Sequence, residues 1–219
     1  MPAAKERLCH LLDLAEEGPA RRAALIGELA DLLLAWPCDW PEAMRAPVAA
    51  LLERTSRESD DGERTKLAAR LGGHGELPLD LINEFYLCAP GGLRREILMR
   101  NELAGPCGDT LAADAAHVVE AARNSTACAF AESFAAAFAV APRTAQAILA
   151  DASGEALAVL CKGAHVERAA FSALALLKGA GEAALPAFDT VPRHAAERLT
   201  RYWQIHHAAP ELARTAAAE

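Results

Sequence analysis

The stretch that decides the fold is residues 77–105, LPLDLINEFYLCAPGGLRREILMRNELAG. On a helical wheel, the apolar residues of 79–88 cover about half of the circumference, which is typical of a helix placed between two neighbours. A Pro-Gly-Gly corner at 90–92 ends this pattern, and a second helical pattern follows over residues 92–103. Two amphipathic segments joined by a tight turn predict an antiparallel helical hairpin.

One arginine and one asparagine of this hairpin fall on its apolar side. Arg94 and Asn101 share the arc of the second helix that Ile97 marks as buried. A guanidinium on an apolar face needs a carboxylate or free carbonyls to offset its desolvation. We therefore expect a structural polar lock, in which Asp80 and Glu84 of the preceding helix are the natural partners.

The other two arginines of the hairpin, Arg95 and Arg100, point away from the apolar arc. They form the first predicted partner-binding surface, although a solvated face without a partner is the alternative. The second predicted surface is on the helix expected over 191–207, VPRHAAERLTRYWQIHH, where Arg198 and Arg201 lie. The alternative there is a ladder of intrahelical ion pairs, because Arg193, Glu197 and Arg201 are spaced by four.

Helical patterns continue along the rest of the chain. Alanine and leucine dominate the composition, which is 53% hydrophobic with 5% aromatic residues, and no strand-like alternation persists. The sequence predicts an all-α protein, either stacked antiparallel hairpins in a HEAT-like α-solenoid or an irregular helical bundle. A loop at 72–76 suggests an N-terminal subdomain over 1–75 and a C-terminal HEAT-like domain over 76–219, with one continuous domain as the alternative. Helices are expected over residues 3–16, 20–35, 78–88, 92–103, 110–122, 126–140, 143–150, 154–162, 166–178 and 191–207, and capping patterns at Asp39 and Asp60 open two more.

The segment 126–140, TACAFAESFAAAFAV, is apolar over nearly its whole circumference. Its phenylalanines Phe130, Phe134 and Phe138 are spaced by four, and we expect it to be the central, buried helix of the C-terminal part. It carries Glu132, so a pocket between helices that uses Glu132, Arg94 and Asn101 is an alternative to core packing.

Charge and cysteine content exclude several classes of function. The net charge of −8 disfavours nucleic-acid binding, which depends on neutralising phosphates. Six cysteines without a CxxC pair, and an N-terminus without a signal-peptide core, predict reduced thiols and a cytoplasmic location. No apolar stretch is long enough for a membrane span without a charge. Four cysteines fall in apolar helical patterns, where a reduced thiol behaves as a small hydrophobe, namely Cys9, Cys88, Cys128 and Cys161.

No catalytic or cofactor motif is present, and we predict neither a cofactor nor a metal site. DASGEAL at 151–157 lacks the GxSxG pattern of a nucleophile elbow, so Asp151 or Ser153 is expected to cap the next helix. His206 and His207 are adjacent and point to different sides of a helix, and Cys161 with His165 gives only two of the four ligands of a structural zinc site.

Two blocks, LRREILMRN and DASGEALAVLCKG, resemble an alphaproteobacterial family known as a domain of unknown function. The resemblance covers about residues 60–207 and implies helical HEAT-like repeats, with no assigned activity or catalytic residue. The sequence therefore predicts a non-catalytic helical scaffold or adaptor that binds another protein. A small-molecule sensor or an enzyme with a pocket between helices is the alternative.

Overall fold

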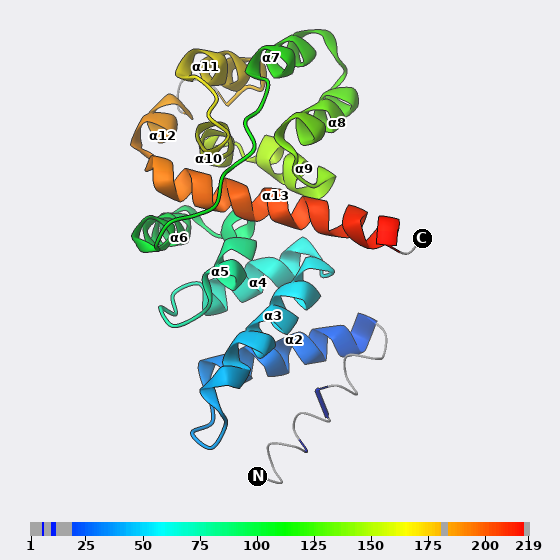
Figure 1. The fold of residues 1–219 in the computed structure, drawn as a ribbon, viewed down its shortest axis with the longest axis vertical. Coiled ribbons are helices and arrows are strands. Elements are labelled where there is room, and N and C mark those ends of the chain that lie inside the picture. The colour runs from blue at the N-terminus through cyan, green and yellow to red at the C-terminus, as the bar shows by residue number, and fades with distance from the viewer. Residues whose placement is uncertain (1–5, 7–9, 12–18, 181–183, 217–219) are drawn as a thin grey trace. The chain divides into compact units, whose positions relative to one another are not determined.

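A computed structural model of the chain describes residues 6, 10–11, 19–180 and 184–216. Within these residues it contains twelve α-helices and two short 3₁₀ helices, and no strand (Figure 1). The all-α prediction is confirmed. The helix expected over 3–16, with Cys9, lies almost entirely outside the described residues.

The chain forms two compact units, Met1–Ile97 and Leu98–Glu219. The division falls inside one helix, α6 (Gly91–Leu103). The loop at 72–76, where the sequence suggests a boundary, lies within the first unit, between α4 and α5.

The first unit is organised around α3, which contacts α2, α4 and α5. The predicted cap at Asp60 is confirmed, because the Asp60 carboxylate accepts from the backbone N–H of Glu63 at 2.9 Å. The pattern at Asp39 has no such role, since the helix there begins at Glu42 after Pro41 without a side-chain cap. The helices of this unit are α2 (Pro19–Leu34), η1 (Glu42–Met44), α3 (Arg45–Arg57), α4 (Asp61–Leu71), α5 (Leu79–Glu84) and η2 (Tyr86–Cys88).

The second unit is built around α10 (Glu155–Gly163), in which residues 156–161 are all buried. α10 contacts α9, α11, α12 and α13 (Figure 1), and α7 contacts α11. Contacts between helices that are not successive are typical of an irregular bundle, one of the two predicted arrangements. The remaining helices are α7 (Ala115–Asn124), α8 (Ala127–Phe138), α9 (Pro142–Ala150), α11 (Arg168–Leu177), α12 (Ala184–Thr190) and α13 (Arg193–Ala216).

The central helix is therefore α10, and the prediction that the 126–140 segment occupies this place is wrong. α8 buries the stripe of Phe130, Phe134 and Phe138 but exposes Ala129, Ala136 and Glu132. Alanine counts as apolar on a helical wheel, yet it has so little surface that leaving it in water costs little. An alanine-rich face therefore does not need a neighbour.

Two glycines let α10 pack closely. A Cβ on Gly163 would lie 2.2 Å from Thr200 Oγ1 and 2.5 Å from the Ala196 carbonyl, so Gly163 allows α10 to approach α13. Gly154, which precedes α10, has a φ of 67°, a left-handed conformation that favours glycine. The Asp151 carboxylate accepts from the N–H of Ala156 at 3.0 Å, and Ser153 Oγ accepts from the N–H of Glu155 at 3.2 Å. The N-cap position itself is Gly154 and has no side-chain cap, so Asp151 and Ser153 bind N–H groups of the first turn from before the predicted cap position.

The segment between α6 and α7 is extended where the sequence suggests a helix from residue 110. Gln204 of α13 accepts from the N–H of Leu111 at 3.0 Å and donates to its carbonyl at 3.1 Å. A backbone bonded in this way has no need of helical hydrogen bonds. α7 begins only at Ala115, after Asp114, whose carboxylate accepts from the N–H of His117.

Candidate metal centre and binding surfaces

Arg94 is fixed at the start of α6 by backbone carbonyls. Its Nε donates to the Tyr86 carbonyl and its Nη2 donates to the Leu87 carbonyl, both at 3.1 Å. The guanidinium also lies 5.4 Å from the centre of the Tyr86 ring. Arg94 thus ties the start of α6 to the 3₁₀ helix before it.

The two carboxylates expected beside Arg94 have different surroundings. Glu84 is buried and accepts from Arg57 Nε at 3.1 Å and from Arg64 Nη2 at 2.9 Å, which joins α3, α4 and α5. Asp80 is exposed, and it makes no hydrogen bond or ion pair within the described part of the chain. The expectation that Asp80 belongs to a buried lock is corrected. Its place in the first turn of α5 suits a solvated carboxylate, because the helix dipole favours negative charge there.

Asn101 and Glu132, the other two polar residues considered for the lock or for a pocket, differ in exposure. Asn101 is fully buried on α6, whereas Glu132 is exposed on α8. Glu132 is therefore not the core carboxylate that a pocket between helices would require.

The predicted partner-binding arginines are all at least partly accessible. Arg95 is exposed, whereas Arg100, Arg198 and Arg201 are half-buried. The Nε of Arg198 is buried without a hydrogen-bond partner among the described residues. Their contact with a partner stays a prediction.

The cysteines in the apolar helical patterns differ in burial. Cys161 is fully buried on α10, and burial raises the pKa of its thiol far above the ordinary value. Cys128 is exposed on α8 and Cys88 is half-buried.

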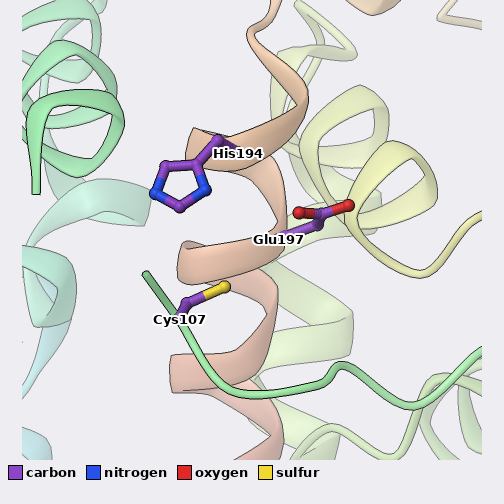
Figure 2. Close-up of side chains that lie close together, drawn as sticks. All are labelled: Cys107, His194 and Glu197. Atoms are coloured by element: carbon purple, nitrogen blue, oxygen red, sulfur yellow. The ribbon is translucent and has the colours of Figure 1, made fainter. Parts of the chain in front are cut away.

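One group of potential metal ligands comes together in the second unit. Cys107 Sγ, a ring nitrogen of His194 and a carboxylate oxygen of Glu197 lie within 4.8 Å of one another, and all three residues are half-buried. Figure 2 shows His194 and Glu197 on successive turns of α13, with Cys107 reaching them from the extended segment before α7. A thiol, an imidazole and a carboxylate are the side chains that bind Zn²⁺ in proteins.

Glu197 faces this group because it does not pair with the arginines of its own helix. Within the described residues its one ion pair is with His165, whose Nδ1 lies 3.9 Å from Glu197 Oε1. No such contact joins it to Arg193 or Arg201. The predicted ladder of intrahelical ion pairs is therefore not formed, and the carboxylate remains available for a ligand.

His194 presents Nδ1 toward the group. Its Nε2 lies 3.1 Å from the carbonyl oxygen of Ala104, which can only accept, so Nε2 carries the proton of the neutral ring. The ring nitrogen on the side of Glu197 in Figure 2 is Nδ1, which then holds a lone pair. Metal-binding histidines usually donate their other ring N–H to a carbonyl or a carboxylate, which fixes the tautomer in this way.

His165 lies beside Glu197 but is not one of the three residues of this group. Thr110 Oγ1 donates its proton to the Gly163 carbonyl at 2.8 Å, so at 3.1 Å it accepts from His165 Nε2. The His165 Nδ1, 3.9 Å from Glu197 Oε1, forms an ion pair with that carboxylate when the ring is protonated. His165 also has a φ of 59°, a left-handed conformation that costs roughly 1–3 kcal/mol in a residue with a side chain.

A groove opens elsewhere in the second unit, between α7 and α11. Its volume is about 740 Å³. The small apolar side chains Ala115, Ala116, Val119, Ala170 and Ala173 line it, with Glu120, Arg123, Asn124 and Glu167 around them. Glu120, Arg123 and Glu167 are exposed, so the groove has a small apolar floor and a charged rim.

No protein-family model, curated protein or solved structure matches the chain. The family resemblance of the LRREILMRN and DASGEALAVLCKG blocks therefore stays a prediction. Among the described residues, no helix combines the length and the apolarity that crossing a bilayer requires.

Sequence reasoning missed both the ligand group and the groove. His194 and Glu197 carry a detectable signal, because a spacing of three places them on one face of a helix. Cys107 and His165 carry none, since they lie in non-helical segments that only the tertiary fold brings to α13.

Proposed function

We propose that this chain is a non-catalytic helical scaffold and that a helix of a partner protein binds in the groove between α7 and α11. The observation that carries this proposal is the floor of the groove. Alanines at 115, 116, 170 and 173 let a partner helix approach closely, as in complexes where an amphipathic helix lies in an apolar groove.

The rim indicates the chemistry of the partner. Glu120 and Glu167 place two negative charges beside the floor, against one positive charge at Arg123. Complementary charges favour encounter and fix the register of a bound helix. The partner helix should therefore present small apolar side chains flanked by lysine or arginine.

The test is to fill the groove and follow capture of the partner. Ala116 is exposed and Ala170 is half-buried, so an Ala116→Trp, Ala170→Trp variant should fold and block the floor. An Ala136→Trp, Ala147→Trp variant, which changes exposed positions on α8 and α9, is the matched control. We expect a protein captured by the wild type and by the control to be lost from the filled variant, with binding of the isolated partner helix then measured by calorimetry.

Two other results would be decisive. Loss of the partner only in the Arg95→Glu, Arg100→Glu or the Arg198→Glu, Arg201→Glu variant would keep the scaffold role but move the contact to those arginines.

The groove volume is also in the range of small-molecule sites, roughly 300–1,000 Å³. A metabolite that raises the melting temperature of the wild type but not of the filled variant would replace the scaffold by a sensor.

A further inference from the structure

We propose that Cys107, His194 and Glu197 bind one divalent transition-metal ion of the zinc type. The three-residue group offers one sulfur, one nitrogen and one oxygen within 4.8 Å of one another. Ligand bonds to zinc are about 2.0–2.3 Å long, so atoms that share a tetrahedral ion lie roughly 3.3–3.8 Å apart, and small movements of these side chains would bring all three onto one ion.

The hydrogen bonds around the group leave acceptors facing one another. His194 Nδ1 holds a lone pair, because Nε2 of the neutral ring carries the proton and donates it to the Ala104 carbonyl. The Glu197 carboxylate lies 3.9 Å from His165 Nδ1 and accepts no hydrogen bond within the described residues. The His194 nitrogen and the Glu197 oxygen therefore both offer lone pairs that one cation could bind.

The chemistry of the donors selects the ion. Sulfur and imidazole ligands favour zinc and related transition metals over Mg²⁺ and Ca²⁺, which prefer oxygen. Binding would release the Cys107 thiol proton to solvent, and the thiolate with the Glu197 carboxylate would then neutralise a doubly charged cation. That neutrality matters here because Arg193, Arg198 and Arg201 are on the same helix.

The positions of the ligands indicate what the ion would connect. Cys107 belongs to the extended segment before α7, and His194 and Glu197 are on α13. Three protein ligands leave the fourth position of a tetrahedral zinc ion to water. The ion would thus hold the connecting segment against α13.

The experiment is a titration of the chelator-treated full-length protein with Co²⁺, followed by absorption spectroscopy. We expect one equivalent to give the intense ligand-field bands of tetrahedral Co²⁺ and a thiolate-to-cobalt charge-transfer band, both lost when Zn²⁺ is added. In Cys107→Ser the charge-transfer band should disappear, whereas Cys128→Ser, which alters an exposed cysteine of the same unit, should behave as the wild type.

Circular dichroism without metal verifies that each variant folds. Two outcomes would overturn the proposal. Absence of a charge-transfer band in the wild type, or its persistence in Cys107→Ser, would show that Cys107, His194 and Glu197 hold no ion together.

Discussion

At the scale of single residues, Glu84 is the buried carboxylate that joins three helices of the first unit, α3, α4 and α5. It is buried between Arg57 and Arg64, and each of these arginines donates to a different carboxylate oxygen. We expect Glu84→Ala to lower the free energy of unfolding by about 3 kcal/mol, because it leaves two partly buried guanidinium groups without this acceptor. Urea denaturation of the full chain measures the change.

Asp80→Ala is the matched control for this prediction. Asp80 is on the same short helix, but its carboxylate is exposed, so we expect a change below about 0.5 kcal/mol. Equal effects of the two substitutions would mean that the cluster around Glu84 contributes nothing beyond an ordinary surface charge.

At the scale of elements, α11 and α12 are joined by an ion pair whose contribution to stability depends on pH. Arg168 donates from Nε and Nη2 to the two carboxylate oxygens of Asp189, at 2.7 and 2.8 Å. These bonds hold the pKa of Asp189 below its ordinary value. Because the folded pKa is the lower one, the pair stabilises the protein above the unfolded pKa, and this contribution is lost as the pH falls through the folded pKa.

We therefore expect the wild type to lose stability more steeply than Asp189→Asn as the pH falls below about 4, the usual carboxyl range. The difference should be small because both side chains are exposed. Arg168→Lys keeps the charge but not the two parallel bonds, and should lie between the two. Melting temperatures across the acid range test this, and parallel curves for all three proteins would contradict it.

The elements also show what a sequence can predict here. Helices such as α3, α4 and α10 follow from local periodicity and from caps such as Asp60, whose partner is three residues away. The predicted start of the helix at residue 110 is wrong because Gln204 bonds the backbone of Leu111, and no local pattern contains that information. The group of Cys107, His194 and Glu197 could not be predicted for the same reason. Glu132 is exposed instead of lying in the core, because the alanines around it are apolar but too small to require burial.

At the scale of the whole molecule, the two units should unfold at different denaturant concentrations. Trp36 and Trp40 are in the first unit and Trp203 is in the second. Each unit has its own buried core, and chains of this kind depart from two-state unfolding. We expect Trp203→Phe and a Trp36→Phe, Trp40→Phe variant to give different urea midpoints by fluorescence.

Glu84→Ala serves as the internal check on that experiment. With Trp203→Phe, where Trp36 and Trp40 report on the first unit, Glu84→Ala should lower the urea midpoint. With the Trp36→Phe, Trp40→Phe variant, where Trp203 reports on the second unit, it should leave the midpoint unchanged. Coincident midpoints in all combinations would show that the molecule unfolds as one cooperative body, with α6 continuous between the units.

The amide of Gln204 has a consequence for how solvent reaches the second unit. It accepts from the N–H of Leu111, donates to the carbonyl of that residue, and donates also to the Phe138 carbonyl at 3.1 Å. The segment before α7 has no helical hydrogen bonds at this point, and amides in such segments usually exchange with deuterium quickly. The Leu111 amide should instead keep its proton for as long as α13 stays in place, so a nonhelical connection would exchange as slowly as the core.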